Sequence, residues 1–300
     1  MILVTGATGT VGRPLVRALR DRGAAVRTLV RDTGGLPAEW DDGVQPVIAD
    51  LNDAGSLAPA LDGIDAVYLL TPVDPEAAQQ ARKVIDAAAT AGRPRVVLQA
   101  ATGVGRRTSH VRFFEAHAAG LDHVRASGLP WTVLAPNGFL QNFLGLAPSL
   151  RSGTLALPTG KAAVSYVDAR DVGEAAAEVL TTDGHDGRIY ELTGPEALTH
   201  EEIAGLIGAV LGREIIYRAA TPGQARAALL DAGLDEWRAS GLVELYGMYA
   251  AGEAATVTEE IPRLLGRPAR SLTAFLTEHA PALRATPPTS QPPTSQERPA

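Results

Sequence analysis

The chain has 300 residues, of which 45% are hydrophobic, and it carries a formal net charge of −7 with no Cys. A chain of this length and composition can bury the core of one large domain or of two lobes. Without Cys it has no disulfide, thiol nucleophile or thiolate metal site, and its acidic balance argues against a nucleic-acid partner, which needs a basic surface. No apolar run reaches the ~18 residues that a membrane-spanning helix needs, so we expect no membrane partner and a cytoplasmic location.

Short apolar runs alternate with segments of helical periodicity through the first half of the chain. The first helix is predicted over residues 10–22, with its aliphatic side chains on one face and Gly23 as the C-terminal cap. Buried strands are predicted at residues 2–5, 26–30, 44–48, 66–70, 96–98 and 132–134. This alternation predicts an α/β fold, a doubly wound parallel sheet with helices on both faces.

The pattern changes after residue 150, where Gly and Pro interrupt the chain. We expect a first domain over residues 1–150, which also uses residues 164–182, and a smaller, mostly helical lobe over residues 151–283. Residues 284–300 are polar and rich in Pro, and this tail is predicted to be disordered. The elements predicted after residue 150 are strands at 164–167, 188–192 and 214–218, a helix at 171–181, a helix from the capping box at 199–202 to residue 211, and further helices to residue 279.

The strongest motif is a loop with the spacing Gly-x-x-Gly-x-x-Gly between the first strand and the first helix. Gly6 permits the tight turn, Gly9 lets the backbone approach a diphosphate, and Gly12 lets the helix pack closely on the strand. An ordinary Gly-rich turn has a similar composition. The position after a buried strand and before a helix favours a dinucleotide site instead.

The residues between these glycines supply the contacts that a diphosphate needs. The amides of Thr10 and Val11 lie at the positive end of the helix dipole, and Thr8 can donate from its hydroxyl. The first domain is therefore predicted to be a nucleotide-binding domain of the Rossmann type.

The residue after the second strand selects the dinucleotide, because an acidic side chain there binds the ribose 2′-hydroxyl of NAD, whereas Arg pairs with the 2′-phosphate of NADP. Arg31 follows the strand directly and favours NADP(H). Asp32 would favour NAD if the strand ended one residue later, and a solvated surface role for Arg31 is the other alternative. Asp50 and Leu51, after the third strand, are placed to flank the adenine, although a capping role for Asp50 is also open.

Together with later motifs, these residues resemble the NmrA-like branch of the atypical short-chain dehydrogenase/reductase superfamily. This branch includes quinone, ketone and imine reductases and cofactor-sensing regulators, and the resemblance covers about residues 1–280. The motifs that carry it are Gly6-Ala7-Thr8-Gly9-x-x-Gly12, Leu29-Val30-Arg31, Ala49-Asp50-Leu51, Ser127-Gly128-Leu129-Pro130-Trp131-Thr132, Pro136-Asn137-Gly138-Phe139-x-x-Asn142, Tyr166-Val167-Asp168-x-x-Asp171-Val172 and Tyr190-Glu191-Leu192-Thr193-Gly194-Pro195.

The resemblance implies NADP(H) as the cofactor, with Arg31 facing the 2′-phosphate. It implies that the segment Leu70-Thr71-Pro72 lies along the cofactor and that residues 137–139 lie near the nicotinamide and the substrate. The further residues expected along the cofactor are Ala100, Pro136 and Phe139.

The sequence departs from the family pattern at the catalytic residues. Members with ordinary chemistry use a Tyr-x-x-x-Lys pair, in which the lysine lowers the pKa of the tyrosine. Neither Lys83 nor Lys161 has Tyr at this spacing, and the residue four positions after Tyr166 is Arg170, which cannot relay protons. A quinone or an aromatic ketone needs such a pair less, because it spreads the developing negative charge into its own ring system.

His117 is the best candidate for the hydrogen-bond or proton donor. It aligns with a histidine of the quinone-reductase members, although Leu121 stands where an acidic residue is expected. Asn137, Asn142 and Tyr166 are secondary candidates for orienting substrate, and each of these side chains, like His117, has a structural alternative. The other His residues lack ligand spacing, so no metal site is predicted. The pair at 106–107, both Arg, either attracts an anionic substrate or lies in a solvated loop.

Two functions remain open on this evidence. The first is an NADPH-dependent oxidoreductase, a ketoreductase or quinone reductase of secondary metabolite biosynthesis, which transfers hydride to a carbonyl of a bulky, aromatic, polyketide-like metabolite. The second is a non-catalytic NADP(H)-sensing regulatory protein, which is suggested by the absence of the Tyr-Lys catalytic pair. The expected partner is a small-molecule substrate, and the expected state is a monomer or homodimer. The fold alone does not choose between the two functions.

Overall fold

Seven parallel strands form the central sheet of the protein. The structure is a computed structural model and describes residues 1–40, 43–105 and 111–284. The strand order is β3-β2-β1-β4-β5-β6-β9, and the order changes direction between β1 and β4, where folds of this kind bind dinucleotides. The strands are β1 (Ile2–Val4), β2 (Val26–Val30), β3 (Val44–Ile48), β4 (Ala66–Leu69), β5 (Arg95–Gln99), β6 (Trp131–Pro136) and β9 (Arg188–Leu192).

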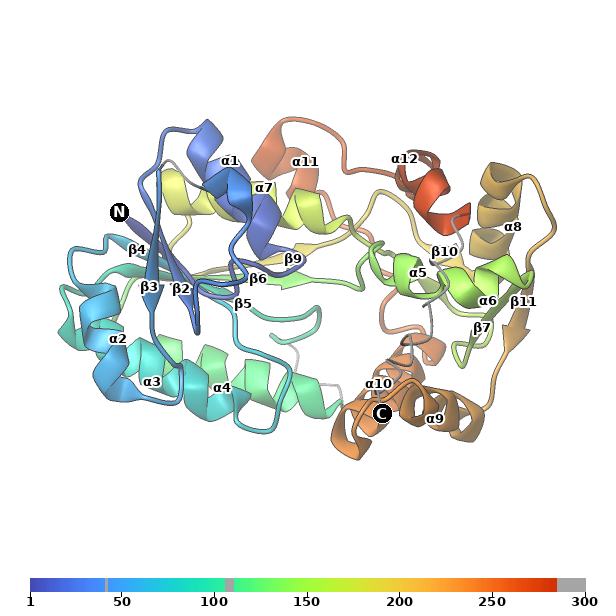
Figure 1. Cartoon of the computed structure of the whole chain (residues 1–300), viewed down its shortest axis with the longest axis horizontal. Helices are drawn as coiled ribbons and strands as arrows, with labels where there is room; N and C mark the ends of the chain where they lie inside the picture. Colours follow the sequence, from blue (N-terminus) through green and yellow to red (C-terminus); the bar gives the residue numbers. More distant parts are fainter. Residues whose placement is uncertain (41–42, 106–110, 285–300) are drawn as a thin grey trace, which may run out of the picture.

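Helices cover both faces of this sheet (Figure 1). Because side chains alternate along a strand, Ile2 and Val4 join the core beneath α1 and α7, and Leu3 joins the core on the opposite face. At Gly173 of α7 a Cβ would lie 2.8 Å from the amide nitrogen of Leu15, so a glycine is needed for the close packing of α1 on α7. One face carries α1 (Gly12–Asp21), α7 (Ala169–Thr181) and α11 (Glu260–Leu265); the other carries α2 (Ala54–Leu61), α3 (Ala77–Thr90) and α4 (Arg112–Ala126), and a short turn η1 (Ala38–Trp40) precedes β3.

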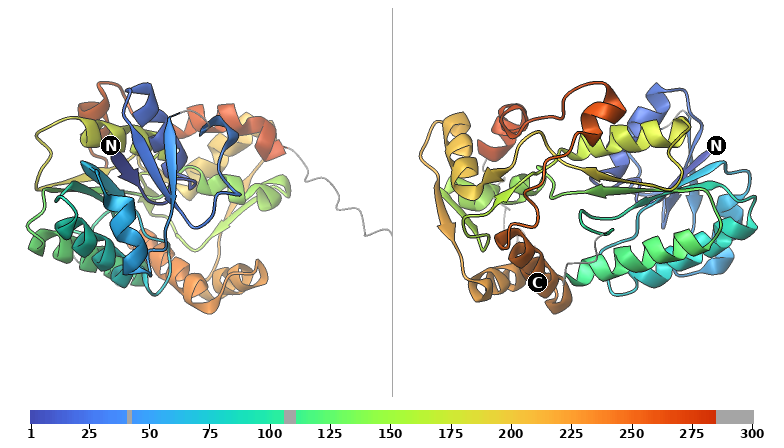
Figure 2. Two further views of the ribbon diagram at one scale, coloured as in Figure 1. Left: turned by 60° about the vertical axis from the view of Figure 1, so that its left-hand side comes forward. Right: turned by 180° about the vertical axis from the view of Figure 1, so that it is seen from behind.

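The remaining elements form a second lobe beyond the carboxyl ends of β6 and β9 (Figures 1 and 2). It has its own core, in which Phe143, Tyr166, Tyr249 and Phe275 are the large aromatic side chains. Two small sheets support it, the antiparallel pair β8–β10 and the parallel pair β7–β11. Its elements are α5 (Asn142–Gly145), α6 (Ala147–Arg151), β7 (Thr154–Leu157), β8 (Ala163–Val164), β10 (Leu198–Thr199), α8 (His200–Leu211), β11 (Ile216–Ala219), α9 (Pro222–Asp231), α10 (Glu236–Ala250) and α12 (Leu272–Arg284).

The structure confirms the predicted fold class and corrects two predicted elements of the second half. β9 joins the main sheet beside β6 and is not part of the lobe. The strand predicted at 164–167 ends early as β8, because the amide of Val167 bonds to the Gly138 carbonyl (2.9 Å) and the chain leaves the small sheet. The predicted capping box is present, since Thr199 and Glu202 each accept a hydrogen bond from the other's amide.

The end of the chain requires a further correction. Arg284, predicted to be the first residue of a disordered tail, is the last residue of α12 and donates to the Val210 carbonyl. Residues 285–300 and the arginines at 106–107 lie outside the described residues. Within residues 1–40, 43–105 and 111–284, every helix falls short of the length and apolar character that a membrane crossing needs.

Candidate nucleotide and substrate site

The glycine loop after β1 adopts a backbone that depends on glycine. Gly6 has a φ of 63°, in the left-handed region. A Cβ on Gly12 would lie 2.1 Å from the carbonyl oxygen of Gly6, so the start of α1 packs directly on the turn. A Cβ on Gly9 would lie 3.1 Å from the same oxygen. The three glycines therefore bring the helix to the strand and leave a bare backbone, which fits the cradle of a diphosphate.

The two amides that precede α1 are available to a ligand. Within the described ranges the amides of Thr10 and Val11 make no hydrogen bond, and α1 has neither a side-chain cap nor an acidic residue in its first turn. Thr8 is exposed, and its carbonyl accepts a hydrogen bond from Arg13 Nε at 3.0 Å. Orphan amides at the positive end of a helix dipole are suited to an anionic ligand. The loop residues thus fit the phosphates of a dinucleotide.

Thr5 fixes the segment that is predicted to lie along the cofactor. Its hydroxyl accepts from the Leu70 amide at 2.7 Å and donates to the Leu70 carbonyl at 2.8 Å. Leu70 also covers the turn, because a Cβ on Gly6 would lie 3.2 Å from its Cδ2 atom. Thr71 and Pro72 follow at the carboxyl end of β4, beside the glycine loop. The structure brings these residues together as the sequence predicts, while their contact with a cofactor stays a prediction.

The two residues after β2 differ in what their side chains do. The Asp32 carboxylate accepts from the amide of Gly34 at 3.0 Å and so stabilises the turn. The Arg31 side chain is exposed and makes no hydrogen bond or ion pair within the described residues. β2 ends at Val30, as predicted, so Arg31 directly follows the strand; its contact with a 2′-phosphate stays a prediction.

Asp50 orders a turn and does not cap a helix, since the N-cap of α2 is Asp53. Its carboxylate accepts from the amide of Asn52 at 2.8 Å, and its own amide donates to Ser56 Oγ at 3.0 Å. These bonds order the turn after β3, in which Leu51 is half-buried. A contact of this turn with the adenine stays a prediction.

The ends of β5 and β6 form the other half of the site. The Ala100 amide donates to the Leu134 carbonyl at 2.8 Å, and the Pro136 carbonyl accepts from the Thr102 amide at 3.0 Å. Phe139 packs with Leu70 on the core beneath α1 and α7, which is also the core of the glycine loop. The predicted cofactor residues therefore lie along the carboxyl ends of β1, β4, β5 and β6.

Asn137 has a structural role that the sequence weighed as its alternative. Its Nδ2 donates to Ser165 Oγ and to the Ala254 carbonyl, both at 2.9 Å, and its Oδ1 accepts from the Gly138 amide at 2.9 Å. Both N–H groups are used, and the side chain is buried. Asn137 thus links the end of β6 to the segment after α10. Because both of its side-chain N–H groups are used in these bonds, neither is free to orient a substrate.

Tyr166 is likewise engaged away from the cofactor residues. Its hydroxyl lies 3.0 Å from His200 Nε2, and His200 Nδ1 lies 2.8 Å from Thr159 Oγ1. The hydroxyl of Thr159 is 3.0 Å from that of Tyr217, which donates to the Leu157 carbonyl at 3.0 Å. Since Tyr217 uses its proton on the carbonyl, Thr159 donates to Tyr217, His200 Nδ1 donates to Thr159, and Tyr166 donates to Nε2.

This chain of bonds corrects the secondary role given to Tyr166. Its proton is directed at a neutral His200 inside the lobe, and burial raises the pKa of the phenol well above its usual value. Arg170, four positions on, is held by Asp168 (2.7 Å) and Glu278 (2.7 Å). Neither side chain of this Tyr-x-x-x-Arg pair is available for proton transfer.

We expect His200 to make the stability of the protein depend on pH. Burial lowers its pKa from 6.5 to about 4, so the unfolded chain takes up the proton first as the pH falls. The stability that this residue contributes is complete above pH 6.5 and is lost as the pH falls toward 4, by at most ~1.4 kcal/mol per pH unit. Urea unfolding over this range measures the slope.

The matched variant is His200→Gln, which retains a donor and an acceptor but does not titrate. Its free energy of unfolding should fall less steeply with decreasing pH than that of the wild type. Equal slopes for the two proteins would show that His200 is not the titrating group.

His117 lies on α4, and its aromatic contact is with Phe114, at 6.3 Å between ring centroids. Burial lowers its pKa to about 4, so its imidazole is neutral at neutral pH. A neutral imidazole can donate a hydrogen bond but is a poor source of a proton. Its role as a hydrogen-bond donor to the substrate therefore stays a prediction.

The aromatic residues of α10 were not among the predicted site residues, because this segment was predicted only to be helical. Tyr249 and Tyr246 are one turn apart on this helix, and their rings contact at 6.3 Å. The ring of Tyr249 also meets that of Tyr166 edge to face, at 6.0 Å. The spacing of two of the six tyrosines at i and i+3 was the available signal. It does not reveal that the helix folds back over residue 138.

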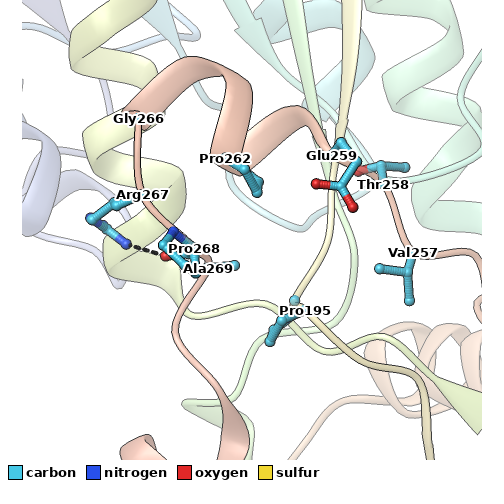
Figure 3. A pocket seen from close by; sticks show the side chains of 10 residues that line it. Pro195, Val257, Thr258, Glu259, Pro262, Gly266, Arg267, Pro268 and Ala269 are labelled. Atoms are coloured by element: carbon cyan, nitrogen blue, oxygen red, sulfur yellow. Dashed lines mark hydrogen bonds between the residues drawn. The ribbon is translucent and has the colours of Figure 1, made fainter.

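A hollow of about 490 Å³ opens elsewhere, between α11 and the chain that leaves β9 (Figure 3). Pro195, Pro262 and Pro268 line it, Glu259 borders it, and none of the predicted site residues takes part. In the part of the chain that the structure describes, no three His, Asp or Glu side chains gather as metal ligands would.

The fold and the glycine loop define a protein of the Rossmann type. Residues 1–273 match the model of the NmrA-like family, and the chain belongs to this family. The resemblance inferred from the motifs is thereby confirmed.

Three related proteins span nearly the whole chain. An NAD(P)H azoreductase of Xenophilus azovorans is 37% identical over 287 residues, 95% of this chain and 100% of that protein. A (4-alkanoyl-5-oxo-2,5-dihydrofuran-3-yl)methyl phosphate reductase of Streptomyces griseus is 36% identical over 94% of this chain and 99% of that protein. The solved structure of the NADPH-dependent quinone oxidoreductase QOR2 of Escherichia coli, complexed with NADPH, is 26% identical, covers 93% of this chain and 99% of its own, and has a TM-score of 0.86.

Proposed function

We propose that this protein is an NADPH-dependent reductase that transfers hydride to a ketone or quinone carbonyl of a bulky aromatic metabolite. It is an oxidoreductase, and NADP(H) is its cofactor, which supplies the hydride when bound. The observation that carries the proposal is the bare glycine loop, whose amides at Thr10 and Val11 have no acceptor among the described residues. The exposed Arg31 follows β2, the strand that pairs with β1. The net reaction joins the carbonyl compound, NADPH and a proton to give the alcohol or hydroquinone and NADP⁺.

Arg31 is expected to determine the preference for NADPH. In Arg31→Ala the 2′-phosphate loses a charge-assisted, forked hydrogen bond, so the affinity for NADPH should fall by about 10- to 100-fold. The affinity for NADH, which has no such phosphate, should change little. Calorimetric titration with both nucleotides measures the difference.

Arg218→Ala provides the control, because Arg218 is also exposed but lies on β11 in the second lobe. It should leave the affinities for both nucleotides unchanged. If Arg31→Ala weakens NADH as much as NADPH, the proposed contact with the 2′-phosphate is wrong.

The class of substrate follows from what the site lacks. The hydroxyl of Tyr166 is directed into the lobe and Arg170 is paired, so no acid assisted by a lysine is present among the described residues. A substrate that delocalises the developing charge suits such a site. Two of the relatives support this class by their names, one a quinone oxidoreductase and one a reductase of a dihydrofuran that carries oxo and alkanoyl groups.

The test is the loss of NADPH absorbance with a panel of quinones and polycyclic aromatic ketones, set against small aliphatic ketones. Turnover should be confined to the conjugated acceptors. Tight binding of NADPH without its oxidation by any of them would contradict the proposal and favour the alternative, a non-catalytic NADP(H) sensor. A cytoplasmic monomer or homodimer stays a prediction.

A further inference from the structure

Tyr249 of α10 reaches the chain just beyond the end of β6. A Cβ built on Gly138 would lie 2.6 Å from the Tyr249 hydroxyl oxygen and 2.7 Å from Cε1 of Tyr166. Residue 138 therefore has to be glycine for the hydroxyl to occupy this place. Gly138 lies between Asn137 and Phe139, in the segment that follows the predicted cofactor residue Pro136. The hydroxyl thus lies where the reacting end of the cofactor and its substrate are expected.

The hydroxyl of Tyr249 has no hydrogen-bond partner among the described residues, and it is not among the fully enclosed unpartnered atoms, so it keeps a small accessible surface. The Tyr249 side chain is only 3% exposed, yet its hydroxyl makes no hydrogen bond within residues 1–40, 43–105 and 111–284. The polar groups around it are already used. The Gly138 amide donates to Asn137 Oδ1, and the Gly138 carbonyl accepts from the Val167 amide. An accessible hydroxyl without a partner in the chain is available to donate a hydrogen bond to a ligand.

The helix that carries Tyr249 is held firmly against α4. Arg112 bonds to the Glu244 carboxylate through its backbone amide at 2.9 Å and through its guanidinium at 2.5 Å. Beside this pair, Gly241 lies so close to Phe113 that a Cβ there would be 2.4 Å from the ring. An ion pair and close packing therefore hold α10 in place, and the ring of Tyr166 packs against that of Tyr249 at 6.0 Å between centroids.

We infer that Tyr249 donates a hydrogen bond to the oxygen of the substrate carbonyl that accepts the hydride, an inference that rests on the proposed function. As the hydride forms a new C–H bond at the carbonyl carbon, or at a ring carbon conjugated with it, the electron pair of the carbonyl moves to its oxygen, and the hydroxyl dipole of Tyr249 stabilises the charge there. The proton that completes the alcohol or hydroquinone comes from water. In a separate effect, burial raises the pKa of Tyr249, so the hydroxyl keeps its own proton at neutral pH.

The experiment compares Tyr249→Phe with the wild type, using menadione as the acceptor. The value of kcat/KM for menadione should fall by about 100-fold, the effect of removing one donor to a developing oxyanion. The Kd of NADPH and the midpoint of thermal unfolding should not change. Tyr190→Phe is the control, because Tyr190 is also a buried tyrosine, but its hydroxyl bonds to His185 at 2.8 Å on β9, away from residue 138; it should retain wild-type kcat/KM.

A second measurement separates this inference from the proposed function. Menadione is titrated into the complex with NADP⁺, which cannot reduce it, and Tyr249→Phe should bind it about 10-fold more weakly than the wild type. Equal affinity and equal kcat/KM in the two proteins would overturn the role of Tyr249 and leave the reductase intact. A parallel loss of NADPH affinity or of folding would show a structural role and overturn it as well. A wild-type protein that neither binds nor reduces menadione would overturn both proposals.

Discussion

Replacing Gly12 with Ala is expected to abolish the binding of NADPH. The added Cβ would lie 2.1 Å from the Gly6 carbonyl oxygen and 2.7 Å from backbone atoms of Ala7, none of which can move without displacing the turn or the start of α1. Either displacement removes the amides of Thr10 and Val11 from the diphosphate. Overpacking of this kind also costs about 1–3 kcal/mol of folding free energy. Calorimetry with NADPH and urea unfolding measure the two effects.

Two further glycines provide a graded comparison. At Gly9 the corresponding contact is 3.1 Å, so Gly9→Ala should weaken NADPH binding less than Gly12→Ala does. Gly205, inside α8, has open space at its Cβ, and Gly205→Ala should leave binding unchanged and raise stability slightly. A Gly12→Ala protein that binds NADPH like the wild type would show that the loop is not the nucleotide site.

Replacing Asp171 with Ala is expected to destabilise the whole fold. The Asp171 side chain is fully buried, and its carboxylate accepts from the guanidinium groups of Arg267 (2.7 Å) and Arg270 and from the Arg270 amide (2.7 Å). Glu174, one turn along α7, pairs with the same two arginines. Loss of one partner of a buried ion pair costs about 3–5 kcal/mol, and we expect the lower end because both arginines keep about a third of their surface exposed. Urea unfolding gives the value.

Asp183→Ala is the control for this variant. Asp183 also pairs with an arginine, Arg95, at 2.9 Å, but its side chain is 99% exposed. Because the Asp183 carboxylate is fully exposed, solvent screens its interaction, and Arg95 keeps its second partner Asp186, so the removal of Asp183 should leave the unfolding midpoint almost unchanged. If the two substitutions changed the free energy of unfolding equally, the ion pairs around Asp171 would not stabilise the fold.

Local patterns were sufficient to predict the sheet and the nucleotide loop. The strands at 26–30, 44–48 and 188–192 have the predicted bounds. The strand at 44–48 was predicted to be buried, but β3 is mostly exposed because it lies at the edge of the sheet. The glycine loop could be recognised because its spacing is set by backbone contacts among neighbours in sequence. The position of β9 in the sheet could not be predicted, because the sequence of a strand does not indicate which other strand it pairs with.

The substrate half of the site was less predictable because its contacts join residues far apart in sequence. Asn137 and Tyr166 have the residue types of catalytic groups, and only their partners, Ala254 and His200, show that their polar atoms are used inside the fold. Tyr249 meets Gly138 across more than a hundred residues of chain. No periodicity in the sequence indicates such a contact, so the predicted site residues were the polar residues of the family motif.

The chain passes repeatedly between the sheet and the lobe, and this connectivity limits the ways in which the substrate specificity of the protein can change. After leaving β6 for α5, the chain returns for α7 and β9 and leaves again for α8 to α10. It returns once more as α11, beside α7, and ends in the lobe as α12. The lobe therefore has no single pair of ends at which it could be cut out and replaced by another. New specificities in this architecture have to arise by substitutions in place, at positions such as those on α10, while the cofactor half stays constant.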